Sequence, residues 1–273
     1  MTDSVMAAAL QMVSVDAVAE NLAAADALIE RAAGDGARLV VLPENFAFMG
    51  REERAALGVA EADGHGPIQD FLAARALRWS ITLVGGSVPL AAEEPDRVRS
   101  ALLVYGPDGR RIARYDKRHL FDVSLPNGEG YRESATFAPG HDVVVAETPA
   151  GMLGLSICYD LRFPEHYRRL VEAGAQILLA PAAFTATTGA AHWAILTRAR
   201  AVENLCFMIA PDQGGRHPNG RATHGESMLI DPWGSVLATC PVGGGAGVAM
   251  AALDFAQLHE IRERLPALAH RLD

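Results

Sequence analysis

Short apolar runs alternate with longer helical patterns along this chain, and this alternation constrains its fold more than any other feature. Residues 39–42 and 177–180 are uninterrupted apolar runs, the kind that is buried on both faces of a sheet. Residues 67–79 instead repeat apolar side chains at helical spacing. Turn residues at 106–109 and 231–234 signal hairpins. Strands mixed with helices and hairpins predict mixed sheets that are covered by helices.

The same patterns predict the remaining elements. We expect strands at residues 5–13, 39–42, 81–88, 98–105, 111–116, 143–145, 153–157, 177–180, 206–210, 227–230, 236–239 and 248–253. We expect helices at residues 14–33 (with Ser14 as the N-terminal cap), 67–79, 164–173, 190–204 and 255–264. This order fits neither a pure β/α barrel nor a Rossmann fold, and no Gly-x-Gly-x-x-Gly follows the first strand.

Composition indicates one globular unit. The sequence has 273 residues, of which 50% are hydrophobic and 21% charged, so a substantial core can form. No proline-rich linker or low-complexity tract divides it, and we expect a single domain over residues 1–273. The formal net charge of −9 argues against nonspecific binding of nucleic acid, which needs clustered Lys and Arg.

The termini and cysteines indicate a cytoplasmic protein. No basic segment followed by an apolar core opens the sequence, as it would in a signal peptide. No apolar run approaches the roughly 20 residues that span a bilayer. Three cysteines at wide spacing form no disulfide framework. We therefore expect a protein of the reducing cytoplasm that does not bind membranes.

Three apolar strands stop abruptly at a reactive side chain. The first runs from Leu39 to Leu42 and is followed by Pro43 and Glu44. Ligands gather at the carboxyl ends of strands in open α/β sheets, so Glu44 is a candidate general base, especially if burial raises its pKa. A surface glutamate at a strand end is the alternative, and this segment alone favours it.

The second segment ends at Lys117, which is followed by Arg118, His119, Leu120 and Phe121. Because apolar residues adjoin these cations, the run differs from an ordinary solvated charge cluster. Lys117 could hold a developing oxyanion as a fixed positive charge. A lysine on an edge strand is an equally good interpretation of this segment alone.

The third segment ends at Cys158, between an apolar strand and a helix that starts at Pro164. A strand-to-helix elbow presents a nucleophile and leaves backbone N–H groups free to bind an oxyanion. A buried structural thiol is the alternative, and it suits Cys206 and Cys240 better, because polar residues follow Cys158 at once.

A cysteine, an acid and a lysine at three strand ends form a coherent set for amide hydrolysis. The thiolate attacks the carbonyl, the acid moves the proton, and the cation holds the oxyanion and favours the thiolate of Cys158. No zinc motif, Gly-x-Ser-x-Gly elbow or phosphate loop is present. Two alternatives stay open. Cys158 could pair with His119, His192 or His224, or it could be a redox-sensing thiol that folding brings near another cysteine.

These segments resemble the motifs of the nitrilase superfamily. They are Leu-Pro-Glu-Asn at 42–45, Tyr-Asp-Lys-Arg-His-Leu-Phe-Asp at 115–122 and Cys-Tyr-Asp-Leu-Arg-Phe-Pro-Glu at 158–165. They occur in the family's order, and the resemblance extends from residue 5 to about residue 270. It implies an α/β fold that is a four-layer α-β-β-α sandwich, a homodimer or higher homo-oligomer, and no metal or organic cofactor.

The resemblance also implies a role for each matched residue. Glu44 corresponds to the general base, Lys117 to the group that stabilises the intermediate, and Cys158 to the nucleophile. Glu133 matches a second glutamate that positions the lysine and the substrate. A catalytically silent relative would lack one of these residues, but all are present.

Within the superfamily, Cys-Tyr-Asp resembles the amidase branches, whereas nitrilases usually carry Trp-Glu after the cysteine. Residues 184–193, 214–217 and 231–234 resemble the deaminated glutathione amidases, which repair a transaminated metabolite. An omega-amidase acting on 2-oxoglutaramate and an N-carbamoyl amine hydrolase are the alternatives. The implied substrate is a small-molecule amide of a 2-oxo acid.

A substrate carboxylate requires a cation near the nucleophile, and Arg162 is the candidate. The alternative for Arg162 is a salt bridge with Asp160 or Glu165. The other expected substrate contacts are the Tyr159 backbone N–H, His119, and the hydroxyls of Thr185 and Thr188, which could instead shape a loop. Arg216 and His217 could reach a longer substrate or be exposed loop residues.

Overall fold

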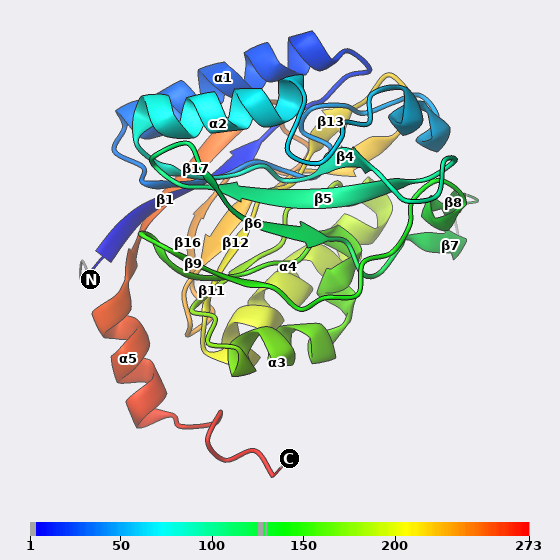
Figure 1. The fold of residues 1–273 in the computed structure, drawn as a ribbon. Coiled ribbons are helices and arrows are strands. Elements are labelled where there is room, and N and C mark those ends of the chain that lie inside the picture. Colours follow the sequence, from blue (N-terminus) through cyan, green and yellow to red (C-terminus); the bar gives the residue numbers. More distant parts are fainter. Residues whose placement is uncertain (1–3, 125–127, 129, 273) are drawn as a thin grey trace.

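Two β-sheets lie face to face between two layers of helices in the computed structural model, which describes residues 4–124, 128 and 130–272 (Figure 1). The first sheet has the strand order β17-β1-β2-β3-β5-β4, with β6 also paired to β5. Its strands are β1 (Ser4–Gln11), β2 (Leu39–Val41), β3 (Thr82–Val84), β4 (Val88–Ala91), β5 (Val98–Tyr105), β6 (Arg111–Asp116) and β17 (Gly247–Asp254). The α-β-β-α fold expected from the resemblance is confirmed.

The second sheet has the order β16-β15-β12-β11-β10-β9. Its strands are β9 (Val145–Thr148), β10 (Gly151–Gly154), β11 (Ile177–Leu179), β12 (Phe207–Ala210), β15 (Met228–Ile230) and β16 (Val236–Thr239). Two small hairpins lie outside both sheets, and they consist of β7 (Asp122–Ser124) with β8 (Gly130–Arg132) and β13 (Gly214–Arg216) with β14 (Ala222–His224).

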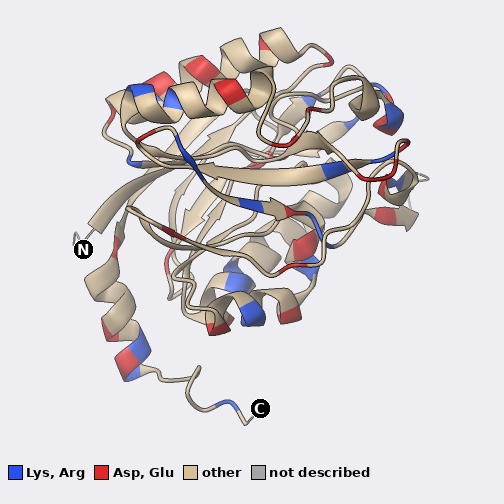
Figure 2. Cartoon of the chain, in the orientation of Figure 1, with Lys and Arg blue, Asp and Glu red and all other residues tan. Residues whose placement is uncertain are grey.

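Helices α1 (Val18–Gly34) and α2 (Pro67–Trp79) cover the first sheet, and α3 (Pro164–Glu172) and α4 (Ala186–Asn204) cover the second (Figure 1). The helix α5 (Phe255–Arg264) follows the last strand. Three short 3₁₀ helices complete the fold, namely η1 (Glu53–Gly58), η2 (Glu133–Ala135) and η3 (Cys158–Arg162). Figure 2 shows Lys, Arg, Asp and Glu mostly on the helices and loops, with both signs mixed on α2 and α3.

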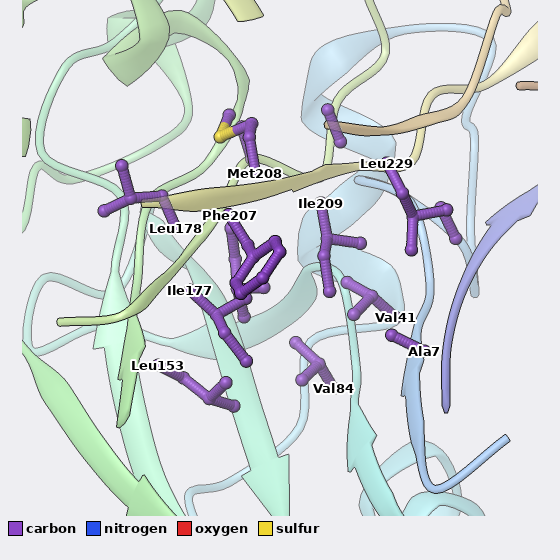
Figure 3. Packing of buried hydrophobic residues seen from close by; sticks show 14 of the residues in the cluster. Ala7, Val41, Val84, Leu153, Ile177, Leu178, Phe207, Met208, Ile209 and Leu229 are labelled. Carbon is purple, nitrogen blue, oxygen red and sulfur yellow. The ribbon is translucent and has the colours of Figure 1, made fainter. Parts of the chain in front are cut away.

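Alternation of side chains along each strand divides the interior into two layers. In β1, Ala7 and Ala9 belong to the cluster between the sheets, whereas Ala8 and Leu10 belong to the cluster under α1 and α2. Figure 3 shows side chains from both sheets in the layer between them, including Val41 and Ile209. Burying a side chain of this size contributes about 1.5–3 kcal/mol, so this layer holds the two sheets together.

Most expected elements are present, and the differences have local causes. The first helix begins at Val18, and Ser14 is wrong as its cap, because the buried Ser14 hydroxyl donates to the Phe46 carbonyl at 3.0 Å. Residues 81–88 contain two strands, since the chain turns at Gly85 and Gly86 between β3 and β4. The fourth helix starts earlier than expected, at Ala186.

Candidate active site

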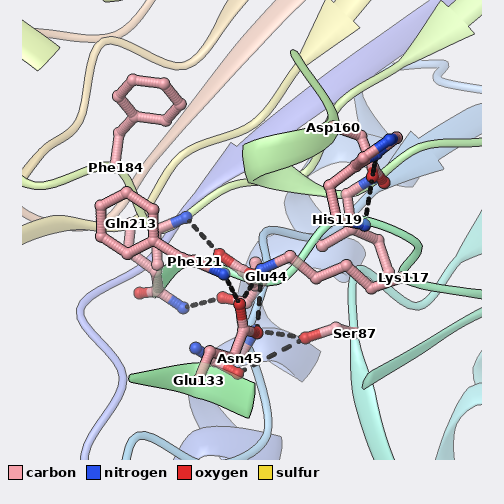
Figure 4. A network of polar contacts seen from close by, with 12 residues as sticks. Glu44, Asn45, Ser87, Lys117, His119, Phe121, Glu133, Asp160, Phe184 and Gln213 are labelled. Carbon is pink, nitrogen blue, oxygen red and sulfur yellow. Dashed lines mark hydrogen bonds and ion pairs between the residues drawn. The ribbon is translucent and has the colours of Figure 1, made fainter. Parts of the chain in front are cut away.

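Two of the three strand-end residues, Glu44 and Lys117, meet at a buried point (Figure 4). Glu44 follows β2 in the first sheet, Lys117 follows β6, and Cys158 follows the extended residues after β10 in the second sheet. The Lys117 ammonium donates to Glu44 Oε1 at 2.7 Å, although the two residues are 73 positions apart. Glu44, Lys117 and Cys158 line the same cavity.

Lys117 lies between two carboxylates. Its ammonium also donates to both oxygens of Glu133, at 2.9 and 3.0 Å. Burial lowers the pKa of Lys117, but the charges of Glu133 and Glu44 outweigh burial and raise it well above 10.5. Burial raises the pKa of Glu133, with Lys117 opposing the shift. Lys117 is therefore a fixed and buried cation in the wall of the cavity.

Backbone groups fix both carboxylates. Glu44 Oε2 accepts a hydrogen bond from the Ala183 N–H at 2.9 Å. Glu133 lies in η2, and its Oε2 accepts from the Phe121 N–H at 2.6 Å. The Glu44 carbonyl accepts from Gln213 Nε2 at 2.9 Å. Each carboxylate is thus oriented by a rigid donor in addition to Lys117, which sets the geometry before substrate binds.

Cys158 lies in a strained elbow at the start of η3. Its φ of 47° is in the left-handed region, which a non-glycine residue adopts only when the surroundings impose it. The Cys158 N–H donates to the Pro181 carbonyl at 2.9 Å. In the described part of the chain, no acceptor binds the next N–H, that of Tyr159. This N–H and the Lys117 ammonium are the donors available to an oxyanion.

The Cys158 thiol is not a preformed thiolate. Burial and the Glu44 charge raise the pKa of the thiol well above 9.0, and Lys117 opposes this shift without cancelling it. The expectation that Lys117 favours the thiolate is correct in direction, but burial outweighs it. A nucleophilic role for this thiol would therefore need a neighbouring base, and Glu44 lines the same cavity.

Asp160 anchors the elbow from behind. Its Oδ2 accepts from the Tyr115 hydroxyl at 2.6 Å and from the Ile157 N–H at 2.8 Å. The backbone N–H of His119 donates to Asp160 Oδ1 at 3.0 Å, and Nδ1 of the His119 ring lies 2.6 Å from the same oxygen (Figure 4). The His119 ring stacks on Phe163 at 3.7 Å and is not among the residues that line the cavity.

The cavity at this point has a volume of about 570 Å³. Three expected substrate contacts line it, namely Tyr159, Thr185 and Thr188. Thr185 also caps α4, since its Oγ1 accepts from the Thr188 N–H at 3.2 Å. The two threonine hydroxyls lie 2.8 Å apart and form one hydrogen bond. The hydroxyl that accepts in this bond keeps its own proton, which it can donate to a ligand.

The structure places Arg162 beside the cavity rather than in its lining. The guanidinium carbon lies 5.9 Å from the Tyr159 ring centroid and 5.4 Å from that of Phe184. Its two terminal nitrogens are each 3.4 Å from His192 Nδ1. Among the described residues, no ion pair joins Arg162 to Asp160 or Glu165, so the salt bridge considered as the alternative is not formed.

Four further residues line the cavity that the sequence did not suggest as site residues, namely Arg221, Glu53, Tyr131 and Phe121. Arg221 is five positions after Arg216, and its place directly after the turn residues Pro-Asn-Gly at 218–220 is the one signal that could have suggested it. Arg216 lines the cavity as well. His217 does not, because Ser14 and Thr223 hold its two ring nitrogens at 2.8 Å.

The alternative partners of Cys158 lie elsewhere. None of His119, His192 and His224 is among the residues that line the cavity. The three cysteines are all buried and unpaired, and burial raises the pKa of Cys206 to about 11. The described chain contains no cluster of three or more metal-binding side chains. No helix within the described ranges is long and apolar enough to cross a bilayer.

Comparison with known proteins agrees with the site. The family described as carbon-nitrogen hydrolase matches residues 6–263. The deaminated glutathione amidase of Synechocystis is 45% identical over 273 residues, which cover 98% of each chain. That of Yersinia enterocolitica is 39% identical and covers 96% of this chain and 91% of its own. The NitFhit protein of C. elegans has a TM-score of 0.92 at 36% identity, covering 99% of this chain and 66% of its own. The chain therefore belongs to the carbon-nitrogen hydrolase family of the nitrilase superfamily and is a hydrolase of amides.

Proposed function

We propose that this protein is a deaminated glutathione amidase with Cys158 as its nucleophile. Hydrolysis of the substrate's amide bond would give 2-oxoglutarate and cysteinylglycine. The observation that carries the proposal is the buried contact of Lys117 with both Glu44 and Glu133 in the cavity that Cys158 lines. The Synechocystis and Yersinia relatives carry this activity in their names.

In the first step, Glu44 takes the proton of the Cys158 thiol while the sulfur attacks the amide carbon. The carbonyl oxygen becomes an oxyanion, held by the Lys117 ammonium and the free Tyr159 N–H. Glu44 then gives its proton to the amide nitrogen, the carbon–nitrogen bond breaks and the amine leaves. The raised pKa of the thiol suits this order, because proton removal coincides with attack.

In the second step, Glu44 takes a proton from water, and the resulting hydroxide attacks the thioester carbon. The tetrahedral oxyanion uses the same two donors. Collapse breaks the carbon–sulfur bond, releases the carboxylic acid and returns the proton to the Cys158 sulfur. Glu133 stays beside Lys117 and keeps the ammonium in place, at 2.9 Å.

The cavity fits a substrate larger than a simple amide. Ligand sites of roughly 300–1,000 Å³ accommodate compounds of drug size, and this cavity has about 570 Å³. Arg216 and Arg221 in its lining suit a substrate that carries more than one carboxylate, as deaminated glutathione does. Omega-amidase activity on 2-oxoglutaramate is the second candidate function, because the same centre would cleave a primary amide.

Product release from three substrates tests this function. We expect the purified protein to hydrolyse deaminated glutathione with a higher kcat/KM than 2-oxoglutaramate, and to release no carbon dioxide from an N-carbamoyl amine. A higher kcat/KM for 2-oxoglutaramate would instead identify an omega-amidase. Release of carbon dioxide from the carbamoyl compound at a higher rate than either would overturn both assignments.

We further propose a single-domain, cytoplasmic homodimer. Pairing of β1 with β17 joins the two ends of the chain in one sheet, which favours a single domain. Unpaired cysteines suit the reducing cytoplasm. Ile195, Val202 and Trp233 are exposed on α4 and the adjacent β15–β16 turn, an apolar surface for a second copy. Sedimentation of the wild type and Trp233→Glu tests the dimer, which the charge should dissociate.

A further inference from the structure

Arg221 has a buried donor that the protein does not use. In the described part of the chain, Arg221 Nε is shielded from solvent and has no hydrogen-bond partner. One terminal nitrogen of Arg221 donates to the Ala183 carbonyl, and the guanidinium carbon lies 4.8 Å from the Tyr131 ring centroid. A buried, unpaired donor of a charged group is costly, and in a cavity wall it indicates that a ligand supplies the acceptor.

The position of Ala183 shows which part of the substrate would reach Arg221. The Ala183 N–H binds the Glu44 carboxylate at 2.9 Å, while its carbonyl binds Arg221. Glu44 must reach the amide nitrogen to protonate it, so the leaving amine lies on the Glu44 side of the scissile bond. The acyl chain lies on the opposite side of the planar amide. Arg221 is therefore on the side of the leaving group.

The leaving group of deaminated glutathione is long enough for this contact. Its carboxylate lies two residues beyond the scissile nitrogen, up to about 7 Å away in an extended chain. The planar guanidinium binds a carboxylate through two parallel hydrogen bonds. Glu53 also lines the cavity and the charge of Arg221 lowers its pKa against the effect of burial, but no ion pair joins the two among the described residues. Arg221 thus keeps donor capacity for a ligand.

We infer that Arg221 binds the terminal carboxylate of the leaving cysteinylglycine and thereby sets the preference for a peptide-substituted amide over a primary amide. The inference rests on the proposed function and adds a specificity-determining residue to it. A primary amide such as 2-oxoglutaramate has no group in this position, so Arg221 should not contribute to its hydrolysis.

Steady-state kinetics of Arg221→Gln on both substrates tests the inference. We expect kcat/KM for deaminated glutathione to fall about tenfold to a hundredfold, mainly through KM, with 2-oxoglutaramate changed less than about twofold. Arg221→Lys should lose less, because it keeps the charge without the paired donors. The matched control is Arg110→Gln, which removes an exposed arginine outside the cavity and should match the wild type on both substrates.

A second measurement needs no variant, so it stays decisive if Arg221→Gln does not fold. In the C-terminal glycinamide form of deaminated glutathione, the terminal carboxylate is replaced by a neutral amide. For the wild type, kcat/KM on this compound should be lower than on deaminated glutathione by the same factor as Arg221→Gln lowers kcat/KM on deaminated glutathione. Equal turnover of acid and glycinamide would overturn the inference, and so would an equal loss of both substrates in Arg221→Gln. If the wild type cleaves 2-oxoglutaramate but not deaminated glutathione, the proposed function falls, and the inference with it.

Discussion

The Lys117 ammonium and the Glu44 carboxylate form a 2.7 Å ion pair in which the side chains are 2% and 6% exposed. Neither charge is stable in such a place alone, because desolvation of an isolated ion costs several kcal/mol. The pair is retained because each group has further partners, Glu133 for the lysine and the Ala183 N–H for the glutamate. The geometry of the candidate site is therefore also a stability requirement of the fold.

Lys117→Met should destabilise the protein as well as inactivate it. The substitution leaves Glu44 and Glu133 as buried carboxylates without their shared cation. We expect the free energy of unfolding to fall by about 3–5 kcal/mol, measured by urea denaturation at neutral pH. Adding Glu133→Gln to this variant removes one of the two charges and should recover part of the loss. If Lys117→Met alone were as stable as the wild type, the buried ion pair would not contribute to stability as we expect.

Gly86 supports Glu44 from the neighbouring strand end. A Cβ at Gly86 would lie 1.9 Å from the Pro43 carbonyl oxygen, and its φ of 43° is strained for other residues. Gly86→Ala should therefore displace the Pro43–Glu44 segment, lower kcat at least about tenfold and reduce stability by about 2 kcal/mol or more. Gly34→Ala is the matched control, since a Cβ there meets nothing within 4 Å. Equal kcat in the two variants would show that Gly86 does not position Glu44.

Asp160 should contribute stability that depends on pH. Burial raises the pKa of Asp160, but hydrogen bonding with His119 and Tyr115 and the charge of His166 outweigh it and hold the pKa below 3.8. A carboxyl whose pKa is lowered on folding stabilises the fold above its unfolded pKa, and this contribution is lost as pH falls through the folded pKa. Its contribution is thus complete at neutral pH and disappears in acid.

The substitution Asp160→Asn tests this pH dependence of stability. We expect the variant to be less stable than the wild type by about 2 kcal/mol at neutral pH. The difference should shrink as the pH falls below 3.8, the ordinary pKa of the group. Urea unfolding of both proteins from neutral to strongly acidic pH measures it. A difference that stays constant over this range would mean that the Asp160 charge plays no part.

The sequence predicts the fold and the centre of the site because both depend on strong local patterns. Strands that end at Glu44, Lys117 and Cys158 pointed to one site, and in the structure the three residues line one cavity. Glu133 was identified only through the family resemblance. Its segment holds no apolar run, and its carboxylate is fixed by the distant Lys117 and by the Phe121 N–H.

The wall of the cavity around Arg221 is harder to predict because it is made of irregular segments. The β13–β14 hairpin has no apolar alternation, so neither the hairpin nor Arg221 at its turn was expected. Arg162, four positions after Cys158, was the expected carboxylate contact, but its side chain lies over the Tyr159 and Phe184 rings. Spacing from the nucleophile does not determine on which side of a 3₁₀ helix a side chain emerges.

The most direct test of the account is a rapid-quench experiment on deaminated glutathione with the wild type, Cys158→Ala and Cys240→Ala. Quenched wild type and Cys240→Ala should carry a 2-oxoglutaryl group on the peptide that contains Cys158, and both should release cysteinylglycine at similar rates. Cys158→Ala should carry no acyl group and lose at least about 10⁴-fold in kcat. Turnover by Cys158→Ala at the wild-type rate would contradict the assignment of Cys158 as the nucleophile.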